Sequence, residues 1–225
     1  MACAVFIALL GGCGSEDPKP RLIMAVGDSI TAGSPGWDPD PERREVLNAD
    51  DPQSQWEYWA EAELGDDEYD VFNCGVPGDR TDEIAARLDG CLAAGADVVV
   101  LQGGVNDLAQ RRSPAYAARN LRAMAKRVRD AGLPVLVANA LPVNRRYRSI
   151  RPKITRLNRL VEALARDQRA PVVDFFATLE DPPGSGRMRA EWTAEGVHPS
   201  VEGYKRLGHA VANALARTGV AAGDT

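Results

Sequence analysis

The chain has 225 residues, of which 44% are hydrophobic and 26% charged, and its formal net charge at pH 7 is -5. This composition is ordinary for a globular protein and gives enough chain for one full-sized domain. The negative charge and the lack of a basic stripe argue against nucleic acid as a partner, because phosphates are bound by clustered lysine and arginine.

Residues 1–12 are almost wholly apolar and end in small residues before Cys13. The pattern resembles a bacterial lipoprotein signal, in which Cys13 would be lipidated. The run is too short to span a bilayer, and no Lys or Arg precedes it, unlike in a typical signal peptide. We therefore expect an exported protein, secreted or attached to the membrane through Cys13. Residues 1–20 would be signal and tether, and residues 21–219 would form one folded domain.

The first predicted strand of the body is Leu22–Val26, because five consecutive apolar residues are typical of a buried parallel strand. Gly27 ends the run, and Asp28, Ser29 and Thr31 follow it. In open α/β sheets, ligands bind at the carboxyl ends of the strands. Ser29 is therefore a candidate nucleophile. The alternative is that these polar side chains only cap the next helix.

A loop rich in Gly, Pro and Asp is expected from Ala32 to Pro52. It leaves the same edge of the sheet, so Trp37 either contacts substrate or packs locally. Its acidic residues lack the regular ligand spacing of an EF-hand and are interpreted as solvated. No metal site is expected in the chain, since its two histidines do not form a His-Glu-x-x-His motif.

Four further apolar runs predict strands, and they alternate with segments of helical period. The strands are expected at Tyr69–Asn73, Asp97–Leu101, Pro134–Ala138 and Pro171–Asp174. The helices are expected at Gln53–Leu64, Thr81–Leu92, Pro114–Ala131, Arg151–Arg169 and Val201–Arg217. This alternation predicts an α/β fold with a five-stranded parallel sheet and helices on both faces.

Cys74 and Cys91 could pair in an exported protein. However, Cys74 is expected at the carboxyl end of a strand, and Cys91 near the far end of the next helix. Roughly 15 Å of helix rise would then separate them, whereas a disulfide requires Cα atoms within about 7 Å. Both are therefore expected to be free thiols.

The arginines Arg145, Arg146, Arg148 and Arg151 form a basic cluster. Such a run is typical of a solvated loop and helix start, and we favour this interpretation over an anion site.

A serine nucleophile needs a base, and only two histidines are available. His209 lies within a predicted helix, whereas His198 lies in a loop before Pro199 with Glu195 three residues earlier. One turn of chain could bring Glu195 against Nδ1 of the ring and leave Nε2 for Ser29. An imidazole titrates near pH ~6.5, so His198 could act as base and then as acid.

Acyl transfer also requires hydrogen-bond donors for the developing oxyanion. We assign this role to the backbone N–H groups of Ser29 and Gly75 and to the side-chain amide of Asn106. Each follows a predicted strand. The alternatives are a turn glycine for Gly75 and a loop cap for Asn106.

Together these motifs resemble the SGNH subgroup of the GDSL-type esterases and lipases. Motifs similar to those of the family occur, in order, at Gly27–Ile30, at Gly75 with Gly78, at Gly104–Asp107 and at Glu195–Pro199. The chain has Glu195 where the family usually has Asp. The resemblance implies a flavodoxin-like α/β/α sandwich and ester hydrolysis through an acyl-enzyme, without a cofactor. Ser29 would be the nucleophile, His198 the base, and Gly75 and Asn106 the oxyanion donors.

We therefore expect a serine esterase for small-molecule or lipid acyl esters, similar to a lysophospholipase or arylesterase. Asp28, Trp37 and Val197 are expected to contact the substrate. Two alternatives stay open: a carbohydrate O-acetyl esterase, and a binding protein that keeps the fold without catalysis.

Overall fold

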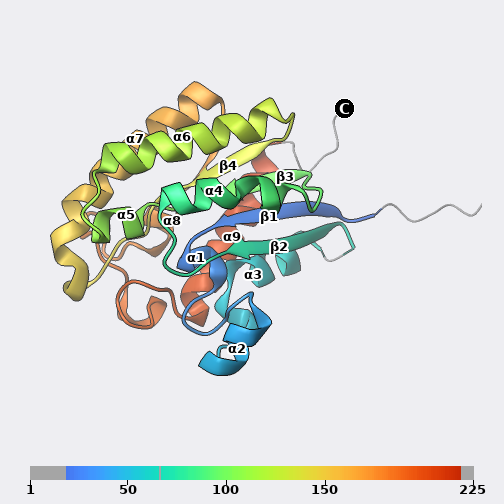
Figure 1. Ribbon diagram of the computed structural model, residues 1–225. Coiled ribbons are helices and arrows are strands. Elements are labelled where there is room, and N and C mark those ends of the chain that lie inside the picture. Colours follow the sequence, from blue (N-terminus) through green and yellow to red (C-terminus); the bar gives the residue numbers. More distant parts are fainter. Residues whose placement is uncertain (1–18, 66, 219–225) are drawn as a thin grey trace, which may run out of the picture.

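A five-stranded parallel sheet forms the centre of the computed structural model, which describes residues 19–65 and 67–218. The strands follow the order β2-β1-β3-β4-β5 across the sheet (Figure 1). Their bounds are β1 Arg21–Gly27, β2 Tyr69–Gly75, β3 Val98–Leu101, β4 Val135–Ala138 and β5 Val172–Val173. All five predicted strands are present, and the predicted α/β/α sandwich is confirmed.

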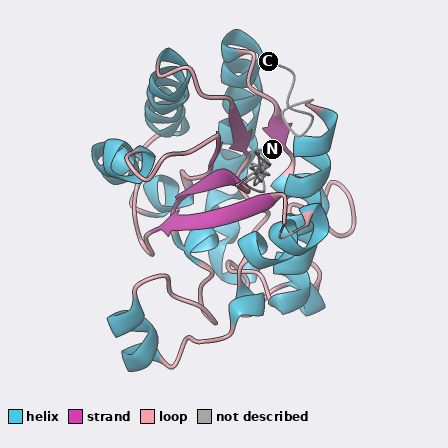
Figure 2. Ribbon diagram, turned by 90° about the vertical axis from the view of Figure 1, so that its right-hand side faces the viewer, coloured by secondary structure: helices cyan, strands magenta, loops and turns pink. Residues whose placement is uncertain are grey.

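Helices cover both faces of this sheet (Figure 2). The predicted long helices are present as α3 Trp56–Leu64, α4 Thr81–Leu92, α6 Pro114–Asp130, α7 Arg151–Gln168 and α9 Val201–Arg217. Short helices lie between them: α1 Ser29–Ala32, α2 Pro41–Leu47, α5 Val105–Ala109 and α8 Phe175–Leu179. The described residues also include the 3-10 helices η1 Pro52–Ser54, η2 Arg145–Ile150 and η3 Ala190–Trp192.

Helix α2 lies within the segment that the sequence predicted as a loop. Asp40 caps it by accepting hydrogen bonds from the N–H groups of Glu42 and Arg43, and Pro41 suits the first helical position. None of its residues is buried. The helix therefore has no apolar periodicity from which it could be predicted. It projects away from the sheet at the foot of Figure 1.

The core consists of two apolar clusters, one on each face of the sheet. In β1, Met24 and Val26 belong to one cluster, and Ile23 and Ala25 to the other, as the alternation of side chains along a strand requires. The first cluster lies under α4, α6 and α7, and the second under α3, α8 and α9. Because both faces are covered, β3 and β4 are continuously apolar, whereas the edge strand β2 also carries Asp70 and Asn73.

Cys74 and Cys91 form a disulfide, with their Cα atoms 6.2 Å apart. The prediction of two free thiols is therefore wrong. It assumed that α4 starts level with the end of β2. Residues 76–80 instead separate the two elements, and five residues can carry the chain roughly 15 Å further. The helix then returns only far enough for Cys91 to come level with Cys74.

The predicted signal and Cys13 lie outside the described residues. None of the helices within residues 19–65 and 67–218 combines the length and the hydropathy that crossing a membrane requires.

Candidate active site

Ser29 is the first residue of α1 and follows β1 after a single residue, Asp28. Asp28 caps the helix, because its carboxylate accepts a hydrogen bond from the Ile30 N–H at 3.0 Å. The helix ends at Ala32 and is capped by Gly33, whose φ of 96° allows the left-handed turn there. Asp28 is only 1% exposed. It therefore positions Ser29 from within the protein, contrary to the expectation that it contacts substrate.

Gln102, which directly follows β3, supports this turn from the neighbouring strand. Its Oε1 accepts hydrogen bonds from the Asp28 N–H at 3.2 Å and from the Thr31 hydroxyl at 3.1 Å. Burial raises the pKa of Asp28 to about 6, while the hydrogen bond from the Ile30 N–H opposes the rise. Gln102 is not among the residues predicted from the sequence, although its place after an apolar strand at the same edge was a usable signal.

His198 lies in a turn that two hydrogen bonds to its own carbonyl oxygen hold in shape. The Thr193 hydroxyl donates to this oxygen at 2.8 Å, and the Ala194 N–H donates at 3.0 Å. Gly196 has a φ of 99°, a conformation that favours glycine. Ser200 then caps α9. The imidazole thus projects from a turn that is fixed on both sides.

Ser29, His198 and Glu195 form one continuous line of hydrogen bonds. The Ser29 Oγ lies 2.9 Å from His198 Nε2, and His198 Nδ1 lies 2.5 Å from Glu195 Oε1. The Glu195 carboxylate also accepts the His198 backbone N–H at 3.4 Å. The His198 side chain is 24% exposed, so an outside molecule can reach it. The structure therefore brings together the three residues predicted to meet, although 169 positions separate the serine from the histidine.

Asn106 and Gly75 differ in whether they have an N–H that is free to bind an oxyanion. The Asn106 amide, in α5, donates to the Asp79 carbonyl oxygen at 2.9 Å, and its second hydrogen has no acceptor among the described residues. The Gly75 N–H already donates to Asn73 Oδ1 at 2.9 Å. A Cβ on Gly75 would overlap the Ala32 backbone, which explains the glycine. Gly75 therefore serves close packing, and its N–H is engaged, contrary to the expectation that it is open to an oxyanion.

The loop between β2 and α4 offers another amide and is held by an arginine. Gly78 in this loop has a φ of 90°, and its N–H has no acceptor within residues 19–65 and 67–218. Arg87 of α4 donates to the Asp79 carboxylate at 2.7 Å, to the Cys74 carbonyl at 2.7 Å and to the Gly27 carbonyl at 2.6 Å. Arg87 thus ties the loop to the ends of β1 and β2. The sequence did not single it out, because its partners are far apart in the chain.

Trp37 and Val197, both predicted to contact substrate, lie in different surroundings. Trp37 lines a cleft of about 350 Å³ at the edge of the sheet, together with residues of α3 and β2. The Arg44 guanidinium stacks on its ring, 4.0 Å from the ring centre. Val197 is partly buried and packs against the first apolar cluster. Trp37 thus borders open space, whereas Val197 contributes to packing.

Asp107, next to Asn106, is fully buried and engaged within the protein. Its carboxylate accepts hydrogen bonds from the Thr81 N–H at 2.9 Å and the Thr81 hydroxyl at 2.8 Å, so it anchors the start of α4.

Within the described part of the chain, no three His, Cys, Asp or Glu side chains gather closely enough to hold a metal ion.

Comparison with known proteins identifies the family. The sequence model of the GDSL-like Lipase/Acylhydrolase family matches residues 25–206. Esterase TesA of Pseudomonas aeruginosa is 30% identical over 208 residues, which cover 88% of this chain and 92% of that protein.

Solved structures agree with this. A crystal structure of a protein named TesA has a TM-score of 0.65 at 27% identity, and the match covers 87% of this chain and 98% of that one. A lipolytic protein of the G-D-S-L family from Desulfitobacterium hafniense has a TM-score of 0.72 at 20% identity, covers 87% of this chain and 99% of its own, and shows the shared fold. The resemblance found in the sequence is confirmed: the chain belongs to the GDSL-like Lipase/Acylhydrolase family and is a carboxylic ester hydrolase.

Proposed function

We propose that the chain is a serine esterase that cleaves carboxylic esters through an acyl-enzyme. Ser29 is the nucleophile, His198 the general base, and Glu195 the carboxylate that orients the imidazole. The single observation that carries this proposal is the continuous line of hydrogen bonds from the Ser29 hydroxyl through the imidazole to the carboxylate. This arrangement is the one that activates a hydroxyl whose own pKa is too high for attack.

In the proposed reaction, Ser29 Oγ attacks the ester carbonyl carbon while its proton passes to His198 Nε2. Glu195 accepts the Nδ1–H and stabilises the imidazolium that forms. The tetrahedral intermediate then collapses, the bond to the alcohol oxygen breaks, and His198 returns the proton to that oxygen. A water molecule, deprotonated by the same ring, attacks the acyl-serine and releases the acid.

Three N–H donors are proposed to stabilise the oxyanion: the Ser29 backbone, the Asn106 side chain and the Gly78 backbone. Gly78 takes the place that the sequence assigned to Gly75, because the Gly75 N–H is engaged by Asn73. The Asn106 amide binds the carbonyl oxygen of Asp79, the residue after Gly78. This hydrogen bond ties Asn106 to the loop, and preorganised donors of this kind are worth roughly 10²–10³-fold in rate each.

The use of Glu195 instead of the family's usual Asp fits the local turn. Glu195 precedes His198 by three residues, and its carboxylate accepts both the ring N–H and the backbone N–H of His198. The additional methylene is taken up by this compact turn. The departure from the motif therefore does not favour a protein without catalysis.

Small or lipid acyl esters are the proposed substrates. Trp37 is proposed to contact them, because it borders the cleft that also includes Asn73, whose side chain donates to the Thr31 carbonyl behind Ser29. The test is a series of p-nitrophenyl esters of increasing chain length. Turnover should vanish in Ser29→Ala and fall steeply in His198→Ala, while Trp37→Ala should change the chain-length preference. Rates confined to acetylated sugars would contradict the proposal and favour an O-acetyl esterase.

We further propose that the protein is exported and attached to a membrane through Cys13, on the basis of the apolar segment and the small residues before this cysteine. Expression with labelled fatty acid should label the wild type and leave Cys13→Ser unlabelled. Label retained by Cys13→Ser would contradict the lipidation.

A further inference from the structure

Three arginines from separate segments gather beside the turn that carries His198. Arg148 lies in η2, Arg151 begins α7, and Arg187 lies in the segment before η3. The Nε–H of Arg151 donates to the Val143 carbonyl at 2.8 Å, and the Val143 N–H donates to the Gly186 carbonyl at 3.2 Å. Val143 therefore links Arg151 to Gly186, the residue before Arg187.

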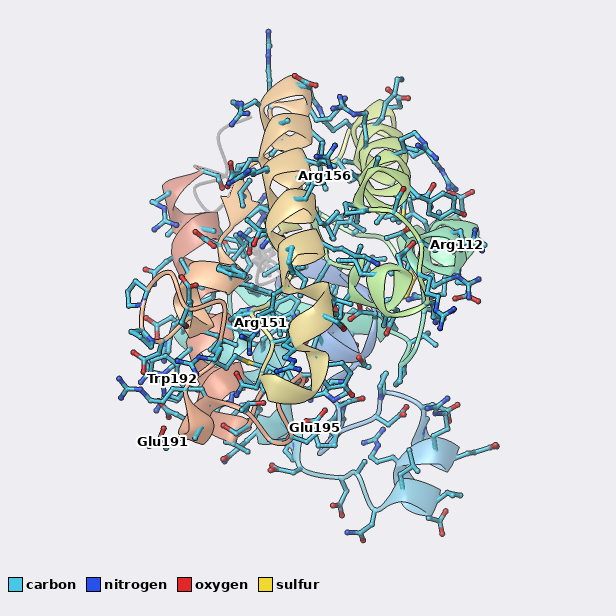
Figure 3. The ribbon with its side chains drawn as sticks, turned by 90° about the vertical axis from the view of Figure 1, so that its left-hand side faces the viewer. Arg112, Arg151, Arg156, Glu191, Trp192 and Glu195 are labelled. Carbon is cyan, nitrogen blue, oxygen red and sulfur yellow. A yellow bond between two sulfur atoms is a disulfide. The ribbon has the colours of Figure 1, made fainter. Side chains whose placement is uncertain are left out.

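The same segments are bonded directly to the proposed catalytic turn. The Met188 N–H donates to Asn144 Oδ1 at 3.0 Å, and the Asn144 N–H donates to the Gly196 carbonyl at 2.7 Å. Gly196 lies between Glu195 and His198 in the chain. Figure 3 shows that Arg151 and Glu195 lie on the same face of the molecule.

The charge of these arginines is not neutralised by the acids of neighbouring segments. Asp181 is paired with Arg189 at 2.9 Å, and Glu180 accepts the Gly186 N–H at 2.6 Å. Within residues 19–65 and 67–218, none of the three arginines forms an ion pair.

The electrostatic effect of Arg148 and Arg187 on Arg151 supports the description of the three as an unneutralised positive cluster. The pKa of Arg151 is lowered, first by its partial burial and then by the positive charges of Arg187 and Arg148. Like charges held together in this way are unfavourable unless an anion joins them. Guanidinium groups bind phosphate and carboxylate through paired hydrogen bonds, and Arg148 and Arg187 expose theirs.

We propose that Arg148, Arg151 and Arg187 bind an anionic group, phosphate or carboxylate, on the alcohol part of the ester substrate. The inference rests on the proposed function, in which His198 returns a proton to the departing alcohol oxygen. The alcohol must therefore lie on the His198 side of Ser29, which is the side where the arginines lie. This replaces the interpretation of the basic cluster as a solvated loop.

The test compares phenyl acetates whose ring carries a phosphate, a carboxylate or no charge. Their acyl groups are identical, so the ratio of kcat/KM for a charged ester to that for the neutral ester reports recognition of the alcohol part. Each lost charge should lower this ratio about fivefold, as a pair of charges ~4 Å apart in water predicts, and added salt should reduce the wild-type preference. The variants are Arg148→Gln, Arg187→Gln and Arg151→Gln.

Two further variants keep the test decisive. Arg156→Gln removes an exposed arginine of α7 that lies further along the helix (Figure 3) and should leave the ratio unchanged. Arg151→Lys retains the charge and should keep most of the ratio, even if the loss of the bond to Val143 lowers the yield of folded protein. The phosphate and carboxylate esters show which anion is preferred.

An unchanged ratio in Arg148→Gln and Arg187→Gln would overturn the proposal, as would an equal loss in Arg156→Gln. If the wild type hydrolysed the neutral ester without any preference for the anionic ones, only the anion site would fail. If it hydrolysed none of the esters, the proposed serine esterase itself would fail.

Discussion

Replacing Asp28 with asparagine should change how the stability of the protein depends on pH. Burial raises the pKa of Asp28 from the ordinary 3.8 to about 6 in the folded protein. Between these values the folded state holds a proton that the unfolded state has lost. The stability contributed by neutral Asp28 is therefore complete below pH 3.8 and is lost as the pH rises through about 6. At ~1.36 kcal/mol per pH unit, the loss is about 3 kcal/mol.

The asparagine side chain of the Asp28→Asn variant would keep the oxygen that accepts the Ile30 N–H but could not ionise. The free energy of unfolding of this variant, minus that of the wild type, should therefore rise by about 3 kcal/mol between pH ~3.5 and pH ~7. Urea unfolding followed by circular dichroism at half-unit pH steps measures this difference. Asp130→Asn, which removes an exposed carboxylate paired with Lys126 at the end of α6, is the control and should stay within about 0.5 kcal/mol of the wild type at every pH. A difference that stayed constant from pH ~4 to ~8 would refute the reasoning.

Three further predictions concern the proposed catalytic residues and the disulfide. Glu195→Gln should lower kcat about a hundredfold or more, because the amide cannot stabilise the imidazolium, whereas Glu195→Asp should retain part of the rate. Equal rates in the wild type and both variants would contradict the role of the carboxylate. Asn106→Ala should lower kcat by roughly 10²–10³-fold with little change in KM, and a change confined to KM would argue against oxyanion stabilisation. Replacing Cys74 and Cys91 with serine should cost about 3 kcal/mol in urea unfolding, since the bridge closes a short loop; unchanged stability would show that the reduced chain is equally constrained.

The sequence predicts the sheet and the long helices well, because their apolar residues recur with the period of the element. β3 is continuously buried, and α6 buries one face, so both leave a clear pattern. Helix α2 leaves none, since nothing in it is buried. The pairing of Cys74 with Cys91 was also missed, because it depends on how far the loop before α4 extends. Loop reach is a tertiary property that local pattern does not contain.

In the candidate site too, some residues could be predicted from the sequence and others could not. Ser29, Glu195 and His198 could be predicted, since each stands next to a strand end or in a short motif. Gly75 could not be judged, because the Ala32 backbone approaches it only once β2 and α1 have packed, although its N–H is taken by Asn73, just two residues earlier. Arg87 joins three backbone segments that lie far apart in sequence. Roles of this kind arise from packing and leave no local motif.

The order of the elements along the chain has a consequence for the timing of catalysis. Ser29 leaves the ribosome early, whereas His198 comes 169 residues later and is followed by α9, which packs against α3. On the proposed assignment, a nascent chain holds a hydroxyl without its proton acceptor through most of translation. On this assignment, the chain becomes able to cleave esters only when the last helix docks. Removal of the segment from His198 onward would therefore abolish ester hydrolysis, although every strand of the sheet would remain in the polypeptide.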